Sequence, residues 1–524
     1  MADGAGKMIG IDLGTTFCAV STLDDHGQPV TLPNRDGEML TPSAVLLPAD
    51  GEAVVGQSAL DVALEQPDRV ATLIKRRMGY PSYGRAVAGR EFRPETLSAV
   101  ILRKLAQDAE ARIGPVRKVV ITVPAYFDDT RRKAVQDAGR IAGLEVLDIL
   151  DEPTAAALAY SFQSAASAPA ELADPSRQRT VLVYDLGGGT FDVTLVRLST
   201  KRFQTLAIEG DVRLGGKDWD DRIVDHVAAQ FQKQAGSDPR TDPQSLTALQ
   251  AAAERAKRTL SKLGQTTVTA THGGRVLTVP LSRADFENLT RDLLVRTRLT
   301  VQQLLRQAGV GWEQVDRVLL VGGSTHMPMT RQMLQDLSGK APDQSLAVSE
   351  VVARGAALHA GIRAAHRHDS RLHLEAAAVD ALAQVVEINV NAHSLGIEVK
   401  QQDDRVNDVL IPKNTQLPTA ASRVYRTVAE NQLKVRVKVL QGEARQTDAC
   451  IGIGECWIEG LPPSLPKGAP VQVRCGVGSN GLIDVMALDM TSGKMARASL
   501  HRSSGLSDEE IAHEAAWVRS LRIQ

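Results

Sequence analysis

The sequence predicts an α/β region followed by an all-β, sandwich-like domain and a short C-terminal helix. Up to about residue 365, short apolar β-branched runs alternate with longer stretches of helical pattern, which is typical of mainly buried sheets covered by helices. From Ser394 onward the pattern changes to strand-like alternation, as in Val435, Val437 and Val439. At about 150 residues per domain, a chain of 524 residues is expected to form several folding units.

In chain order, strands are expected at 8–12, 117–123, 180–184 and 317–321, and a helix at 251–263. These elements define a first domain over 1–365, which a polar and Ala-rich linker over 366–391 follows. A β-rich domain is expected over 392–503, with turns at Pro462-Pro463 and Asn480-Gly481. In 504–524, Ser507 and Glu510 form a capping box that opens one helix of roughly four turns.

Composition argues against several classes of partner. The 61 basic and 62 acidic residues leave a net charge of -1, so no overall field favours nucleic acid or an anionic membrane. The N-terminus has no signal-peptide pattern, and no stretch is apolar enough to span a bilayer, which favours a soluble, cytoplasmic protein. The cysteines lack metal-site spacing and are expected to be reduced thiols: Cys18, Cys450, Cys456 and Cys475.

Two similar segments carry the chemistry. Ile9–Thr16 and Val183–Asp192 are each an apolar strand that ends in Asp, turns on glycine and resumes as a strand. Glycines let backbone N–H groups approach phosphate oxygens, Thr hydroxyls add donors, and Asp holds Mg²⁺ or its waters. One such hairpin is usually only a turn, but two copies with Thr at matching offsets predict a polyphosphate site.

A P-loop is the competing phosphate device, and Gly215-Gly216-Lys217 comes close to it. The four-residue gap before Gly-Lys is missing, and Asp218 stands where Ser or Thr is needed, so the P-loop interpretation fails. Amides of Gly215 and Gly216 that face a phosphate are still compatible with the sequence.

The chain resembles the seventy-kilodalton heat-shock chaperones of DnaK type, which are members of the actin and hexokinase superfamily. The resemblance runs almost end to end and preserves the order of the family's motifs: Ile11–Thr16, Val123–Phe127, Asp151–Thr154, Asp185–Asp192, Leu214–Gly216, Glu254–Ser261, Val321–Thr325, Ile411–Thr415 and Val439–Glu443. It implies an actin-like (ribonuclease-H-like) ATPase domain of two lobes, followed by the β-rich substrate-binding domain and a remnant of the helical lid. The implied activity is ATP hydrolysis coupled to binding and release of unfolded polypeptide segments.

The resemblance also implies site residues. Asp12, Asp185 and Asp192 would hold the metal ion, mostly through water, and the catalytic group would be Lys75, Glu152, Asp185 and Thr190. Phosphate binding would fall to the turns, through Gly14, Thr15, Thr16, Gly187, Gly188, Gly189, Gly215 and Gly216. Without the resemblance, Lys75 would be assigned to a surface basic cluster, Glu152 to a helix cap, and the Asp and Thr residues to turn capping.

Adenosine binding would involve two further segments. Glu254, Lys257, Arg258 and Ser261 lie on one face of the expected helix, which is ordinarily a solvated face with an i,i+4 ion pair. By resemblance Arg258 stacks on the base, and Gly322, Gly323 and Ser324 hold the opposite side. The family usually has Arg where this chain has His326 and often Asp where it has Ser349, so weaker adenine binding is expected.

Other matches concern coupling and clients. Pro124 and Arg132 match a pair that relays nucleotide state to the linker, although a strand-terminal proline and a surface arginine are the ordinary interpretation. Val428 and Val435 match the peptide-binding pocket. Three features depart from the family: Glu387 interrupts the apolar linker and is expected to face water, 400–405 is expected to be a longer and polar loop, and the lid is nearly absent.

By resemblance the cofactors are ATP or ADP, Mg²⁺ and K⁺, and the partners are unfolded polypeptides, a J-domain co-chaperone and a nucleotide-exchange factor. Two alternatives stay open. One is a nucleotide-sensing scaffold, which the polar 400–405 segment and the missing lid favour; the other is a small-metabolite kinase on the same scaffold, which leaves the β-rich domain unexplained.

Overall fold

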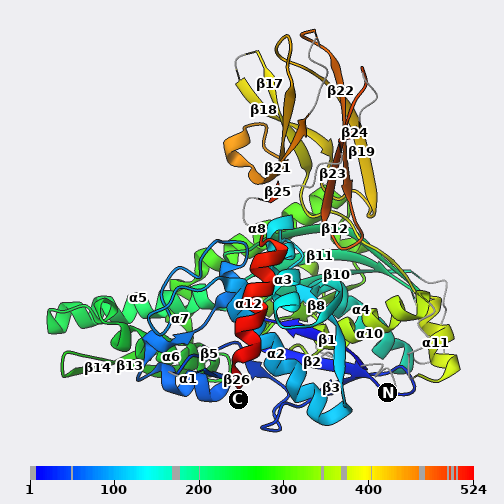
Figure 1. Cartoon of the computed structure of the whole chain (residues 1–524). Helices are drawn as coiled ribbons and strands as arrows, with labels where there is room; N and C mark the ends of the chain where they lie inside the picture. The colour runs from blue at the N-terminus through cyan, green and yellow to red at the C-terminus, as the bar shows by residue number, and fades with distance from the viewer. Residues whose placement is uncertain are drawn as a thin grey trace.

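The computed structural model describes residues 7–48, 51–167, 178–199, 201–343, 347–367, 374–402, 404–459, 466–491, 495–496, 501–502 and 505–524. In these residues the chain forms two α/β lobes, a β-domain that stands above them in Figure 1, and a C-terminal helix that returns to the first lobe. Across the same residues, no helix combines the length and the apolar character needed to cross a membrane.

The two lobes are built on sheets with matching strand order. In the first lobe the hairpin β1–β2 continues to β3, and β8 and then β9 lie parallel on the other side of β1. In the second lobe the hairpin β10–β11 continues to β12, and β15 lies parallel to β10. The strands are β1 (Lys7–Leu13), β2 (Phe17–Leu23), β3 (Pro29–Leu32), β8 (Val116–Val123), β9 (Glu145–Asp151), β10 (Arg179–Leu186), β11 (Phe191–Leu198), β12 (Arg202–Asp211) and β15 (Arg317–Val321).

Helices cover both sheets and join them. Buried apolar side chains of β8, β10, α4 (Glu152–Ser167) and α10 (Val351–His366) share one core, so these two helices pack between the lobes. The first lobe adds α2 (Pro94–Ile113) and α3 (Asp129–Ile141). The second adds α5 (Gly216–Ala235), α6 (Pro243–Leu260), the hairpin β13–β14 (Gln265–His272, Arg275–Ser282), α7 (Arg283–Leu289), α8 (Arg291–Ala308) and α9 (Pro328–Ser338).

A small sheet extends the first lobe. It has the strand order β26–β6–β5–β7, and α1 (Gln57–Ala63) packs on it. Its strands are β5 (Val45–Leu46), β6 (Glu52–Val55), β7 (Val70–Ala71) and β26 (Arg522–Ile523), and the short β4 (Thr41–Pro42) pairs with β2. The 3-10 turn η2 (Ile74–Arg77), which carries Lys75, follows β7.

The β-domain consists of two antiparallel sheets around one apolar core. One sheet has the order β18–β17–β20–β21–β25, from strands Asp404–Ile411, Leu395–Gln401, Lys434–Gln441, Ile451–Glu459 and His501–Arg502. The other has the order β19–β22–β23–β24, from strands Thr419–Arg426, Pro470–Val477, Ile483–Asp489 and Met495–Ala496. Apolar residues alternate toward the shared core, as in other sandwiches.

The segment before the β-domain is structured. After α11 (Ala376–Ala383), which packs on α10, strand β16 (Val386–Ile388) pairs in parallel with the edge strand β12. The expectation that Glu387 faces water is wrong. Its side chain is 13% exposed, and one carboxylate oxygen lies 2.6 Å from Nδ1 of His359 on α10, whose Nε2 lies 3.0 Å from Asp148. The charge is therefore accommodated by a buried partner.

The C-terminal segment packs on the first lobe. The expected capping box is present: Ser507 accepts from the Glu510 backbone, and α12 (Asp508–Ser520) follows. Ile511 and Val518 join the core beside α2 and α3, and the Trp517 ring lies 5.2 Å from that of Phe92. Figure 1 shows α12 running down this lobe to β26, which pairs in parallel with β6.

Most expected elements are confirmed. The four expected strands are β1, β8, β10 and β15, and the helix expected at 251–263 lies within α6 and its C-terminal turn. The Asn480-Gly481 turn joins β22 to β23, while Pro462 and Pro463 lie outside the described residues. The expectation of a long loop at 400–405 is wrong. Strands β17 and β18 form a hairpin that stays paired almost to its tip, where Lys400 faces Arg405 and Gln401 faces Asp404.

Candidate functional site: a cleft between two glycine hairpins

The two glycine turns meet between the lobes. A Cβ placed on Gly188 would lie 2.6 Å from Oγ1 of Thr16, and one on Gly189 would lie 2.6 Å from Cγ2 of Thr15. Such distances are too short for any side chain, so the turn of β10–β11 touches the threonines that follow β1. In the first turn, a Cβ on Gly14 would lie 2.1 Å from the carbonyl oxygen of Phe17. The close approach of these backbones requires glycine.

Carboxylates line the same cleft. Asp185 and Asp192 are buried and face each other in the register of the hairpin, and Asp12 accepts a hydrogen bond of 3.0 Å from Thr122. Burial and then the charge of Glu152 raise the pKa of Asp12 to about 7 and lift the pKa values of Asp185 and Asp192 well above the ordinary value. These carboxylates repel one another and favour a cation between them.

The arrangement suits Mg²⁺ held with its waters. Across the described residues, no three His, Cys, Asp or Glu side chains are grouped so that they could hold a metal ion on their own. Mg²⁺ normally keeps several waters and binds one or two carboxylates together with substrate phosphates. The separated carboxylates and the glycine turns therefore fit a metal that arrives with a polyphosphate.

Lys75 and Glu152 form a buried ion pair at this site. Lys75 lies on η2, and its Nζ donates to Oε1 of Glu152 at the start of α4. Burial by itself lowers the pKa of Lys75, but the charges of Glu152 and Asp12 outweigh it and raise that pKa. A protonated ammonium group is thus held at the carboxylates. Thr190, also buried, closes the second turn, because its carbonyl oxygen accepts from the Gly187 amide at 3.0 Å.

Gly215 and Gly216 support the second turn. The Gly216 amide donates to the Gly187 carbonyl oxygen at 2.9 Å, and the Gly215 amide donates to Asp218 at 2.8 Å. Both amides therefore have protein acceptors in this structure, so the possibility that they face a phosphate gains no support. A Cβ on Gly215 would lie 2.5 Å from the Gly189 nitrogen, which explains why this position has no side chain.

The helix expected to bind adenosine flanks the cleft. Lys257 is buried and donates to the Gly216 carbonyl oxygen at 3.0 Å and to Asp220 at 2.9 Å. Arg258 pairs with Glu254, the ordinary i,i+4 contact, and its guanidinium lies 5.4 Å from the ring centre of Phe17 in the first lobe. The Ser261 hydroxyl donates to its own helix at 3.0 Å, on the Lys257 carbonyl oxygen.

The opposite wall follows β15. Gly322 has φ 83°, and a Cβ there would lie 2.7 Å from a carboxylate oxygen of Asp185. The Ser324 hydroxyl donates to the Gly187 carbonyl oxygen at 2.9 Å, and Gly323 leaves open space at its Cβ position.

His326 lies next to this wall. Burial, with the nearby charges of Arg331 and Lys262, lowers the pKa of His326, so its imidazole is neutral at pH 7. His326, Ser349 and neighbours line a cavity of about 380 Å³.

Contacts from the cleft reach the β-domain. Pro124 directly follows β8, and two residues later the Tyr126 amide donates to Asp192 at 2.8 Å. The carbonyl oxygen of Tyr126 lies 2.9 Å from Nε2 of His393, and the two rings lie 4.3 Å apart. Arg132 pairs with Asp151 at 2.5 Å and donates to the Asn480 carbonyl oxygen at 3.4 Å.

Tyr126 and His393 were missed by the sequence analysis. Tyr126 lies inside a recognised motif, Val123–Phe127, which offered a signal for it. His393 lies in no recognised motif, and only the fold brings it to Tyr126. The proposed relay residues Pro124 and Arg132 flank the Tyr126–His393 contact, but no single feature of the sequence identifies His393 as the partner of Tyr126.

The residues expected to bind peptide lie in the β-domain. Val435 on β20 is half-buried against the apolar core, and Val428 is 63% exposed after β19. In the same domain, charges of the β17–β18 hairpin are paired: Glu398 on β17 pairs with Arg405 on β18 and contacts Lys438 on β20 at 2.8 Å. Its charges are thus partly neutralised within the β-domain.

Comparisons with known proteins agree with this geometry. The family model described as "Hsp70 protein" matches residues 8–83 and 81–516. Proteins named "Chaperone protein DnaK" from two strains of Halobacterium salinarum are each 40% identical over 513 residues, covering 96% of this chain and 76% of the relative. The chain therefore belongs to the Hsp70 family: it is an ATP-dependent molecular chaperone and an ATPase.

Proposed function

We propose that this chaperone hydrolyses ATP in the cleft between its two glycine hairpins and passes the nucleotide state to the β-domain through Tyr126 and His393. The observation that carries the proposal is the contact of the Gly188–Gly189 turn with Thr15 and Thr16, beside the buried Lys75–Glu152 pair. This contact joins backbone turns, hydroxyls, an ammonium group and carboxylates in one site.

Each group then has a role that its chemistry allows. Asp12, Asp185 and Asp192 would hold Mg²⁺ with its waters, and the bound ion would neutralise charge on the phosphates. Lys75 would supply a positive charge, and the Thr190 hydroxyl and Glu152 carboxylate would orient a water molecule. Arg258 and His326 would flank the base, with Lys257 and Ser324 holding the second turn in place.

The β-domain would bind extended, unfolded segments near Val435 and Val428. The partners proposed with it are a J-domain co-chaperone and a nucleotide-exchange factor. Peptide titration in the presence of ATP and of ADP tests the client role directly. A fluorescent apolar peptide that binds more tightly with ADP supports it, and no binding in either state contradicts it and favours the nucleotide-sensing scaffold.

Single-turnover hydrolysis tests the site. Thr190→Ala removes one hydroxyl and is expected to slow hydrolysis about 100-fold or more, because one lost donor at developing charge commonly costs that much. Thr278→Ala is the matched control, since Thr278 is an exposed strand residue that bonds only Thr269 in the described contacts. A Thr190→Ala variant that turns over at the wild-type rate would refute the assignment.

A further inference from the structure

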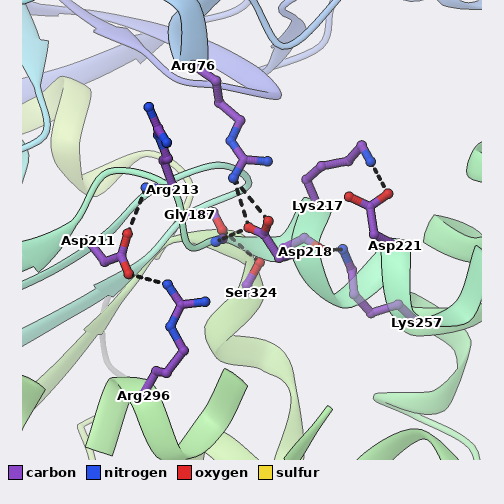
Figure 2. A network of polar contacts seen from close by, with 12 residues as sticks. Arg76, Gly187, Asp211, Arg213, Lys217, Asp218, Asp221, Lys257, Arg296 and Ser324 are labelled. Carbon is purple, nitrogen blue, oxygen red and sulfur yellow. Dashed lines mark hydrogen bonds and ion pairs between the residues drawn. The ribbon is translucent and has the colours of Figure 1, made fainter. Parts of the chain in front are cut away.

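An ion pair crosses the cleft from one lobe to the other. Arg76 belongs to η2 of the first lobe, next to Lys75, and Asp218 lies in the first turn of α5 in the second lobe. Nη2 of Arg76 lies 3.1 and 3.0 Å from the two carboxylate oxygens of Asp218. Figure 2 shows Arg76 reaching down from the first lobe to Asp218 on α5.

The pair lies at the phosphate-binding turn. Asp218 also accepts from the Gly215 amide at 2.8 Å, and Gly215 packs against Gly189. A Cβ on Gly189 would lie 2.9 Å from Cγ of Arg76, so the stem of Arg76 covers the same turn. Arg76 therefore contacts the turn with its methylene groups and the second lobe with its charge.

A second contact crosses at the same end of the cleft. Nη2 of Arg213, in the turn between β12 and α5, donates to the Tyr80 hydroxyl of the first lobe at 2.6 Å. That contact is exposed to solvent, whereas the side chains of Arg76 and Asp218 are only 19% and 24% exposed. Partial burial reduces screening by water and salt, so the ion pair is the stronger of the two contacts.

The position of the pair decides what it does. Ion pairs within one lobe, such as Arg296–Asp211 and Lys217–Asp221, keep their geometry when the lobes separate. The Arg76–Asp218 pair must break before the cleft can widen at the phosphate end. We propose that Arg76 and Asp218 form a latch that holds the lobes closed and limits the rate of nucleotide release. Both act as positioning residues, because they hold the closed cleft rather than the reacting atoms. The inference rests on the proposed nucleotide site.

The test measures release from the full-length chain. The protein is loaded with N-methylanthraniloyl-ADP and Mg²⁺, chased with excess ATP, and followed by stopped-flow fluorescence, with single-turnover hydrolysis measured in parallel. Arg76→Gln removes the charge, and Asp218→Asn removes it while keeping an oxygen for the Gly215 amide. Arg296→Gln and Asp221→Asn are matched controls that break ion pairs within the second lobe.

Each single variant is expected to release the fluorescent ADP about 3- to 10-fold faster, the range for losing a partly buried charged contact. The double variant is expected to be no faster than either single variant, because the two residues form one contact. Wild-type release should accelerate with salt while both variants lose that dependence, and hydrolysis of bound ATP should stay within about twofold.

Three results would overturn the latch. The first is release of the fluorescent ADP at the wild-type rate in both single variants. The second is a double variant in which the accelerations of the two single variants multiply. The third is faster release in Arg76→Gln alone, which would mean that Arg76 contacts the nucleotide itself. If the wild-type chain fails to bind the fluorescent ADP, the proposed function fails as well, whereas unchanged release from a chain that binds it overturns the latch alone.

Discussion

At the scale of single residues, the structure shows how the charge of Glu387, which interrupts the apolar linker strand β16, is neutralised. Glu387 contacts His359, which also contacts Asp148, and Arg363 lies 3.4 Å from the same aspartate. Burial by itself lowers the pKa of His359, but the charges of Glu387 and Asp148 outweigh it and raise that pKa to about 10. The imidazolium is therefore the form at pH 7.

This pair predicts how linker docking depends on pH. A histidine whose pKa is raised on folding stabilises fully below its unfolded pKa, about 6.5, and that contribution is lost as pH rises through its folded pKa. Docking of β16 should thus weaken between pH 7 and pH 9 in the wild type, as measured by hydrogen exchange of 386–388. The double variant His359→Gln with Glu387→Gln should lose this pH dependence of the exchange protection of 386–388. An identical slope in the double variant would contradict the account.

The same pair shows where sequence reasoning stopped. Strands, helices, turns and both glycine hairpins have local signals of period and turn chemistry, and these were predicted. Glu387 lies on β16 and His359 on α10, so their contact depends on how these two elements pack together. Whether the amides of Gly215 and Gly216 face a phosphate was undecided for the same reason, because the acceptor that each amide meets depends on the fold and not on the local sequence.

At the scale of elements, α12 and β26 form a clasp on the first lobe. The backbone of Arg522 donates to Gly51 at 2.9 Å, and that of Gln524 donates to Ala53 at 2.8 Å, so the last residues add a strand to the small sheet. Trp517 packs on Phe92, and the Arg90 guanidinium lies 4.7 Å from the Trp517 ring. The helix expected from the capping box is therefore part of the packing of the ATPase lobe.

Trp517→Ala should destabilise this lobe. Trp517 is half-buried, so the loss is about 2 kcal/mol, below the 3–5 kcal/mol typical of a fully buried Trp, and the melting temperature of the lobe should fall by roughly 4–8 °C. Calorimetry of the variant measures this fall in melting temperature. His513→Ala, on the exposed face of the same helix, is the control and should leave the melting temperature within about 1 °C. Equal melting temperatures for the two variants would show that α12 does not pack as described.

At the scale of the whole molecule, the β-domain and the linker are docked on the ATPase lobes (Figure 1). Asp129 accepts from the Ile483 amide at 2.9 Å, and Lys413 contacts Glu209 at 2.7 Å. With the Tyr126–His393 contact, these bonds connect the β-domain to both lobes. A change in the angle between the lobes therefore cannot leave all of these contacts intact.

His393→Ala should uncouple the domains. The variant removes the ring that meets Tyr126 while leaving the cleft complete, so single-turnover hydrolysis should persist. ATP-triggered release of a fluorescent peptide should slow several-fold, because docking of the β-domain is weakened; stopped-flow measures it. His26→Ala, an exposed residue of the first lobe that pairs with Glu375, is the control. Normal peptide release in His393→Ala would rule this route out.

The central claim is that two glycine hairpins meet to form one nucleotide site, and the contact between Gly188 and Thr16 tests it most directly. The measurement is the equilibrium affinity for Mg²⁺-ATP in wild type, Gly188→Ala, Thr16→Ala and the double variant, with Gly264→Ala as a control in open space. Gly188→Ala should weaken binding about tenfold or more in the wild-type background, because the added methyl overlaps the Thr16 side chain. In the Thr16→Ala background the same change should cost little. An affinity unchanged by Gly188→Ala, or weakened equally in both backgrounds, would contradict the account.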